Sequence, residues 1–290
     1  MSLPKAVQPV FTMTVDELNK KFKYRPFVMR ENRAILNARV IGDDITVRDT
    51  FEQVVQACLM ENKNEKVDVP SLPAHLVDYM FLQIFTKSET DMLPVTYTCR
   101  NQILVEEEFD EVDEDGNDKK VTREVLKECG HQTRNHLDLK QVKIVYPDGY
   151  KEKKAIKVDD EITLNIDYPK SSSMRELYTA HDKDEDDNYL FTEEQREQAN
   201  LKLIFDSIVN VTKISNGVET ITYPNDEGFS IEDFQEWLDE SPKHVTTELL
   251  MFYQVLPIIH LKTNMQCINP DCLHKSEYEF IGVRSFLDLS

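Results

Sequence analysis

The sequence lacks the features that identify membrane-spanning, fibrous and secreted proteins. No stretch approaches the roughly 18 uninterrupted apolar residues of a transmembrane helix. The 7 glycines and 12 prolines are too few for a fibrous or low-complexity chain. The first residues, MSLPKAVQPVFTMTVDEL, contain no apolar run of signal-peptide length. We therefore expect a globular protein that remains in the cytoplasm where it is made.

The common enzyme motifs are also missing. The sequence contains no HExxH, no GxSxG, no glycine-rich phosphate loop and no Cys-His pair in a recognisable nucleophile setting. The histidines outside the cysteine motifs are scattered, and a surface or core position explains each of them better than catalysis: His75, His136, His181, His244 and His260. We predict no catalytic residue, no organic cofactor and no enzymatic activity.

Basic residues are scarce relative to acidic ones. The chain has 34 Lys and Arg against 54 Asp and Glu, which gives a formal net charge of -20. Such a field repels phosphate backbones and anionic lipid headgroups, so we expect neither nucleic acid nor membrane among the partners. Acidic residues are densest at 106–118. A solvated hairpin tip is the default interpretation of this run, and a docking surface for a basic partner is the alternative.

The first 170 residues mix β-type and helical patterns. The runs FTMTV and AILNARVIG are β-type, whereas FEQVVQACLM, capped by Asp49 or Thr50, and AHLVDYMFLQIFTKSE have helical spacing. From Pro94 the pattern has period two. It predicts a strand in VTYTC. It then predicts a hairpin whose two strands are ILVEEEFDEV and KKVTREVLKEC and whose turn lies at Asp115-Gly116. Further strands are predicted in HLDLKQVKIVY and ITLNIDYP, with a turn at 147–149 between them.

After a polar segment that begins near residue 170, the pattern becomes helical. Thr192 and Ser230 begin capping-box sequences, and Pro242 suits the first turn of a further helix. Asn216-Gly217 predicts a short hairpin between these helices, and IIHLKTNMQC and KSEYEFIG predict two final strands.

These patterns predict an α+β fold. We expect a β-rich N-terminal half with two helices, and a helical C-terminal half that closes in a zinc-ribbon-like β-hairpin. The predicted domains are 1–170, with an acidic hairpin inserted at about 100–128, a mainly helical segment 171–258, and a zinc-knuckle hairpin 259–290 that packs back on the first half.

The cysteines carry the most specific chemical signal. Disulfides explain them poorly in a reducing cytoplasm. CINPDCLH places Cys267 and Cys272 in a tight turn between two strands, which is typical of a zinc knuckle and supplies two of the four ligands that tetrahedral zinc needs. Cys99 ends a strand, and a hairpin insertion would bring Cys129 back beside it. We therefore predict one structural zinc site made of Cys99, Cys129, Cys267 and Cys272.

Alternatives to a four-cysteine site remain open. His131 and His274 each lie two residues after a cysteine and could replace one as ligand, or hydrogen-bond to the ligands. Buried free thiols are the other explanation, as we expect for Cys58 on an apolar helix face. A closed thiolate site leaves no position for substrate, so the metal would stabilise the fold without catalysing a reaction.

A second, weaker metal motif lies in DKDEDDNYLFTE. Asp182, Asp184, Asp186 and Glu193 have the spacing of a calcium loop, but the sixth position, where that loop needs glycine for its sharp turn, is Asp187. An acidic linker is the favoured interpretation.

The sequence resembles the baseplate hub proteins of T-even-type tailed bacteriophages. The resemblance is carried by YRPFVMRENRAILNAR, by LPAHLVDYMFLQIFTKSE followed by a strand ending in cysteine, and by the C-terminal FQEWLDESPKHVTTELLMFYQVLPIIHLKTNMQCINPDCLHKSEYEFIGVRSFL. It covers most of the chain, excluding the acidic hairpin and residues 170–200. Two departures concern the knuckle: four residues separate its cysteines where the family has two, and Leu273 replaces a glycine.

The resemblance implies a structural or assembly subunit of a tail baseplate hub, present in the host cytoplasm during assembly and in the virion baseplate. Its partners would be other tail and hub proteins, including the tape-measure protein. The alternatives are a tail assembly chaperone absent from the mature virion, a zinc-ribbon regulator that binds nucleic acid, and an enzyme with a metal centre. The net charge weighs against the regulator, and the enzyme would need an open coordination position.

Overall fold

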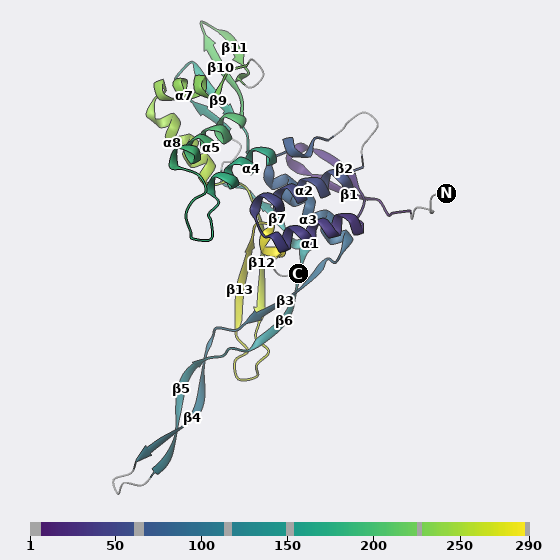
Figure 1. The fold of residues 1–290 in the computed structure, drawn as a ribbon, viewed down its shortest axis with the longest axis vertical. Helices are drawn as coiled ribbons and strands as arrows, with labels where there is room; N and C mark the ends of the chain where they lie inside the picture. Colours follow the sequence, from purple (N-terminus) through teal and green to yellow (C-terminus); the bar gives the residue numbers. More distant parts are fainter. Residues whose placement is uncertain (1–6, 61–66, 113–117, 149–153, 225–227, 288–290) are drawn as a thin grey trace. The chain divides into compact units, whose positions relative to one another are not determined.

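The computed structural model describes residues 7–60, 67–112, 118–148, 154–224 and 228–287 (Figure 1). The chain divides into two compact units, each built from two stretches of sequence. Unit 1 comprises Met1–Thr90 and Val142–His260, and unit 2 comprises Asp91–Gln141 and Leu261–Ser290. Helices and largely antiparallel strands are mixed, so the α+β class is confirmed. The boundary predicted near residue 170 falls inside unit 1.

One part of unit 1 is a helical layer with a small hairpin. Its elements are β1 (Phe11–Val15), the 3-10 turn η1 (Asp16–Leu18), β2 (Lys20–Tyr24), α1 (Met29–Ile41), α2 (Asp44–Cys58), η2 (Val69–Ser71), α3 (Ala74–Ser88) and α4 (Ser171–His181). Helix α2 lies against α1, α3 and α4. The ring centroids of Phe51 and Phe81, one from α2 and one from α3, are 4.1 Å apart in this core. Cys58 is fully buried there, as expected for a core cysteine.

Several predictions for these elements were wrong. The run AILNARVIG lies in α1, where Ile35 and Ala38 are buried at helical spacing and Gly42 ends the helix with a φ of 78°. Helix α2 starts earlier than predicted because Asp43, not Asp49 or Thr50, caps it: its carboxylate accepts the Thr46 N–H at 2.7 Å. The N-terminal half therefore has three α-helices where two were expected, and the polar segment after residue 170 contains α4.

The second part of unit 1 is a four-stranded antiparallel sheet in the order β11-β10-β9-β8 with helices on it. Its elements are β8 (Ala155–Lys157), β9 (Ile162–Ile166), α5 (Glu193–Asp206), β10 (Ile208–Ser215), β11 (Val218–Thr222), α7 (Ile231–Glu240) and α8 (Lys243–Gln254). Side chains from the sheet and the three helices form one buried cluster that includes Leu164, Phe205 and Leu249. Helix α5 ends at Asp206, and strand β10 begins two residues later at Ile208.

The local signals in this part were interpreted correctly. Thr192 and Ser230 both form capping boxes, in which each hydroxyl accepts the N–H of the third helical residue. Asn216 and Gly217 connect β10 to β11 with φ values of 53° and 78°, the backbone that a two-residue hairpin turn requires.

A buried polar network also lies in unit 1. The Glu17 carboxylate contacts His75 Nε2 at 2.8 Å, accepts the Tyr146 hydroxyl at 2.9 Å, and faces Lys154 Nζ at 3.3 Å. Burial raises the pKa of Glu17, but these contacts, the one to His75 foremost, outweigh it and lower the pKa from 4.5 to about 2. Glu17 is therefore ionised in the folded state across the ordinary pH range.

The sign of this shift gives a prediction about acid stability. Because the folded-state pKa lies below the ordinary value, the network stabilises the fold above pH 4.5, and this contribution is lost as the pH falls toward 2. The difference in unfolding free energy between the wild type and Glu17→Gln should shrink, by on the order of 3 kcal/mol, between pH 5 and pH 2. Urea unfolding at several pH values measures it. Glu108→Gln, at an exposed carboxylate, is the matched control, and an equal shrinkage in both variants would contradict the prediction.

Unit 2 combines two strand pairs that come from two separate stretches of the sequence. Strand β3 (Met92–Thr98) pairs antiparallel with β6 (Gln132–Asp138), which is followed by the turn η3 (Leu139–Gln141). Strand β12 (Ile258–Gln266) pairs with β13 (Lys275–Ile281), which precedes the short helix α9 (Arg284–Leu287). The first residues of β12, which belong to unit 1, pair with β7 (Lys143–Val145). The buried core of unit 2 includes Leu93, Val95, Leu137, Leu261, Met265 and Phe286.

A long hairpin is inserted between β3 and β6. Strands β4 (Gln102–Val112) and β5 (Asp118–Glu128) are paired from Gln102↔Glu128 to Val112↔Asp118 and form a two-stranded sheet of their own (Figure 1). The predicted hairpin is confirmed, while its predicted turn at Asp115-Gly116 and part of the turn at 147–149 lie outside the described residues. No helix in the described part of the chain is long and apolar enough to cross a membrane.

Candidate metal centre

Two backbone turns present the four cysteines of unit 2. In the first knuckle, Cys99 follows β3 and Cys129 precedes β6; the Cys99 N–H donates to the His131 carbonyl at 2.9 Å, and the Gly130 N–H donates to the Cys99 carbonyl at 3.0 Å. In the second knuckle, Cys267 follows β12, and its N–H donates to the His274 carbonyl at 2.8 Å. The two knuckles are thus closed in the same way.

The residue after the last cysteine of each knuckle has left-handed backbone. Gly130 has a φ of 61° and Leu273 a φ of 46°. Glycine adopts this conformation without cost, whereas a side chain makes it less favourable. Leu273 therefore stands where the local geometry favours glycine. Its backbone nevertheless has the left-handed conformation that the knuckle requires.

The four thiols converge on one point. The Sγ atoms of Cys99 and Cys272 are 3.8 Å apart, as are those of Cys129 and Cys267, and all four lie within 4.8 Å of one another. A disulfide would need a separation of about 2.05 Å. Four thiolates at about 2.3 Å from a tetrahedral zinc ion lie about 3.8 Å apart, so this arrangement fits zinc. Among the described residues, no other group of three or more potential ligands converges in this way.

The cysteine prediction named residues that the structure brings together, all within a single unit. The sequence placed two of the predicted ligands in each half of the chain, and the fold joins these stretches in unit 2. His131 and His274 contribute through their backbone carbonyls, and their rings do not belong to the converging group. Asp182, Asp184, Asp186 and Glu193 form no comparable cluster either, because the Asp184 carboxylate accepts the backbone N–H groups of Asp186 and Asn188 instead.

The environments of the thiols differ. Cys99 and Cys267 are buried, while Cys129 and Cys272 are partly exposed. Burial raises the pKa of Cys99 to about 12, against the lowering effect of the Asn101 backbone N–H. Burial also raises the pKa of Cys272, but the His274 backbone N–H and the Asn101 side chain outweigh it and lower that pKa to about 7. A bound divalent cation would favour the thiolate form of every cysteine in the group.

Two asparagines link the knuckles, and the sequence analysis missed them. Asn101 Nδ2 donates to Cys272 Sγ at 3.5 Å, and Asn269 Nδ2 donates to Cys129 Sγ at 3.3 Å. Each asparagine therefore reaches from its own knuckle to a thiol of the other. The available signal was their position, since each follows the first cysteine of its knuckle by two residues.

Removing these amides should weaken metal binding without abolishing it. Partners that hydrogen-bond to metal ligands typically change metal affinity by about 10–100-fold. We expect Asn101→Ala and Asn269→Ala each to lower zinc affinity within this range, because each leaves one thiolate without a neutral donor. Competition with a chromophoric chelator measures the affinity. Gln102→Ala, at an exposed neighbouring position, is the control, and wild-type affinity in both asparagine variants would contradict the role.

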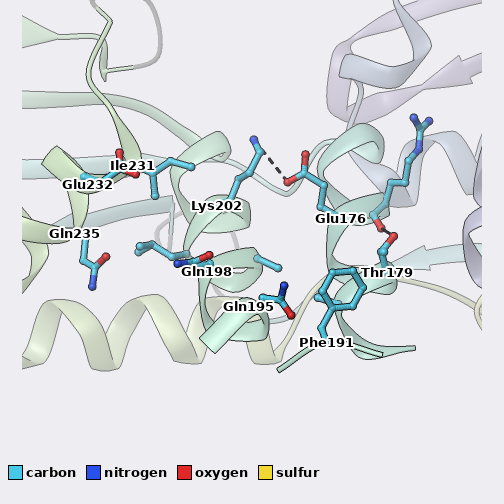
Figure 2. A pocket seen from close by; sticks show the side chains of 13 residues that line it. Glu176, Thr179, Phe191, Gln195, Gln198, Lys202, Ile231, Glu232 and Gln235 are labelled. Carbon is cyan, nitrogen blue, oxygen red and sulfur yellow. Dashed lines mark hydrogen bonds and ion pairs between the residues drawn. The ribbon is translucent and has the colours of Figure 1, made fainter. Parts of the chain in front are cut away.

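A separate pocket lies in unit 1 between α4, α5 and α7. Its volume is about 550 Å³, and Figure 2 shows Gln195, Gln198 and Gln235 beside it together with Phe191. Its lining also includes Lys202, whose Nζ lies 3.9 Å from the Glu176 carboxylate. The lining contains no histidine and no cysteine, so it offers no nucleophile-base pair of that kind and adds no argument for catalysis.

Comparisons with known proteins give one match. A family model described as T4 bacteriophage base plate protein matches residues 8–288. Comparisons with curated proteins and with solved structures give no match. The matched region includes all four cysteines and both asparagines.

Proposed function

The chain belongs to the T4 bacteriophage base plate protein family, and from this premise we propose that it is a structural subunit of the baseplate hub, without enzymatic activity. Its membership makes it a phage baseplate protein with a structural or assembly role. The match over residues 8–288 carries this conclusion. Assignment to the hub is supported by the sequence resemblance at the N-terminal YRPFVMRENRAILNAR and at the C-terminal knuckle.

The same proposal includes a structural zinc ion on Cys99, Cys129, Cys267 and Cys272. The convergence of four Sγ atoms within 4.8 Å supports it. Bound zinc would fasten two stretches that are separated by more than a hundred residues, and four thiolates would leave it no open position for substrate. The residues of this site would then have a structural role: the strand ends form the two knuckles that carry the cysteines, and Asn101 and Asn269 orient the thiols.

Mass spectrometry of purified phage tails tests the assembly role. A hub subunit should be present in finished tails at a fixed ratio to the other baseplate proteins, and electron microscopy of a tagged chain should place it on the tail axis. Presence only in assembly intermediates would instead identify a chaperone. A location at the baseplate periphery would keep the family role and exclude the hub.

Two further measurements separate the remaining classes. The chain should not retard short DNA in a gel at low salt, because its net charge of -20 opposes phosphate binding. Salt-dependent retardation would favour a nucleic-acid-binding regulator. Zinc coordinated by water or substrate as well as protein ligands would favour an enzyme.

A further inference from the structure

The β4–β5 hairpin is a two-stranded ribbon whose two faces differ in charge. Residues directly opposite each other on antiparallel strands share a face, so the register assigns every second residue to the same side. One face is apolar around Val105 and Phe109. Its described charges are those of Glu107, Arg123 and Lys127, and they nearly cancel.

The other face of the ribbon, which we call the acidic face, carries a large excess of negative charge. Its described charged residues are five exposed carboxylates and one lysine: Glu106, Glu108, Asp110, Glu124, Glu128 and Lys120. Glu106 lies directly opposite Glu124, and a like-charged pair of this kind destabilises a ribbon. Nearer the base, Leu104 lies opposite Leu126, and these two side chains are 61% and 64% exposed. A repulsive pair and an apolar pair therefore lie side by side in solvent.

Helix α1 presents an exposed apolar stripe. Its inward side is formed by the buried residues Glu31, Ile35 and Ala38. Residues spaced by three and four positions share one side of a helix. The outward face of α1 is formed in this way by four exposed residues: Met29, Arg33, Leu36 and Val40. The three apolar members of this stripe are all exposed, Val40 by 87%.

The region around α1 is basic although the chain as a whole is acidic. Residues 18–42 contain seven basic residues and one acidic residue, a net charge of +6, so the rest of the chain carries -26 of the total of -20. The one acidic residue, Glu31, is buried and lies 3.0 Å from Arg25 and 2.9 Å from Arg30. Helix α1 therefore places no carboxylate on its outward face.

From these two surfaces we propose that the acidic face of the ribbon in one copy of the chain docks on the outward face of α1 in a second copy. Both surfaces combine exposed apolar side chains with charge of one sign, and the two signs are opposite, so carboxylates meet guanidinium groups where leucines meet leucines. Because the two surfaces differ, the contact is head-to-tail and repeats from copy to copy until a ring closes. The inference goes beyond the proposed function and does not require the hub assignment.

The order of the residues sets the orientation of the contact. On the ribbon, the leucine pair is nearer the base, and Glu106 and Glu124 lie further out. On α1, Arg33 precedes Leu36, while Asp43 lies beyond the C-terminal end of the helix. The leucines of the ribbon therefore pack over the C-terminal half of α1. The outer part of the ribbon runs toward the start of α1, away from the repulsive aspartate.

The lengths of the two surfaces agree. Leu104 and Asp110 are six residues apart on a strand, which corresponds to roughly 20 Å. Met29 and Val40 are eleven residues apart on a helix, which corresponds to roughly 16 Å. One ribbon face therefore covers the exposed stripe of one α1.

Sedimentation of the purified, zinc-loaded full chain tests the association. The weight-average mass should rise above that of one chain as the concentration increases through the micromolar range. It should fall again at about 1 M salt, where the screening length is only about 3 Å. The mass of a single chain at every concentration overturns the inference, and so does association that salt does not weaken.

A charge swap assigns the association to these two surfaces. Arg33→Glu and Glu124→Arg should each weaken it roughly tenfold, equivalent to about 1.4 kcal/mol, because each places like charges across the contact. A chain that carries both substitutions should recover, since the exchanged charges attract again, and this recovery shows that the single variants are folded. Lys213→Glu, the same reversal at an exposed position of β10, is the matched control and should have no effect. Unchanged association in both single variants, or a double variant that does not recover, overturns the inference.

Photo-crosslinking identifies the occupant of the acidic face. Isotopically heavy chains with a benzophenone amino acid in place of Leu104 are mixed with light chains that lack it. We expect adducts from position 104 of heavy chains to α1 of light chains, and none to α1 from the matched probe at Phe109 on the other face. Adducts confined to a single chain, or to a part of the second copy outside α1, overturn the inference. Adducts from position 104 in purified tails to a different protein alone overturn it as well.

Discussion

Replacing Cys267 with serine should abolish stoichiometric zinc binding and unfold unit 2 while unit 1 stays folded. Cys267 is fully buried at the end of β12, and unit 2 has a small core for a body that also supports the long hairpin. Zinc binding contributes about 10–16 kcal/mol in small domains that fold around the metal, far more than a core of this size can supply. Metal analysis and hydrogen exchange of the full chain measure both effects.

The control for this prediction is a cysteine outside the site. Cys58 is equally buried but lies in α2 of unit 1. Cys58→Ala should keep the zinc and the protection of β3, β6 and β12, with at most a moderate loss of stability in unit 1. Cys99→Ser should behave like Cys267→Ser because both thiols belong to one site. Full zinc content in either serine variant would contradict the shared site.

Asp78→Ala should produce the second large effect, a loss of about 3–5 kcal/mol in the unfolding free energy of unit 1. Asp78 holds Arg48 with two hydrogen bonds, at 2.6 and 3.3 Å, between α3 and α2. Burial lowers the pKa of Arg48, but Asp78 and Tyr178 outweigh it and keep that pKa above its usual value. Without Asp78, a buried guanidinium loses its counter-charge, which costs more than the pair contributes when intact.

An exposed ion pair provides the comparison. Lys120 and Glu108 lie 3.0 Å apart, with side chains that are 69% and 63% exposed. Glu108→Ala should leave the opening free energy of the β4–β5 hairpin within about 1 kcal/mol of the wild-type value. Chemical denaturation followed by tryptophan fluorescence, with Trp237 in unit 1 as the probe, measures the Asp78 variant, and hydrogen exchange of β4 and β5 measures the control. A loss below about 1 kcal/mol in Asp78→Ala would contradict the account of this ion pair.

Signals confined to a few residues predicted structure best. The capping boxes at Thr192 and Ser230 and the turn at Asn216-Gly217 depend on hydrogen bonds and backbone angles that neighbouring residues determine. Alternating apolar residues likewise predicted β3, β12 and β13. The predicted strand HLDLKQVKIVY overlaps only the end of β6 and is otherwise divided between η3 and β7. The same logic holds for the cysteines: each lies at a strand end, where a knuckle can form locally.

Errors arose where packing overrides local preference. Ile35 is β-branched, yet it is buried in α1, because contacts across the helical layer outweigh a weak intrinsic preference. Helix α4 was missed because its sequence, SSSMRELYTAH, is polar overall and buries only a few small residues. The division into units could not be predicted from composition, since both units are assembled from separated stretches. Asn101 and Asn269 were missed because their role appears only once the two knuckles face each other.

X-ray absorption at the zinc edge of the purified full-length chain is the most direct test of the metal site. The account predicts one zinc per chain with a first shell of sulfur alone, four atoms at about 2.3 Å. A chain purified without metal under reducing conditions, or zinc with nitrogen or oxygen in its first shell, would contradict it.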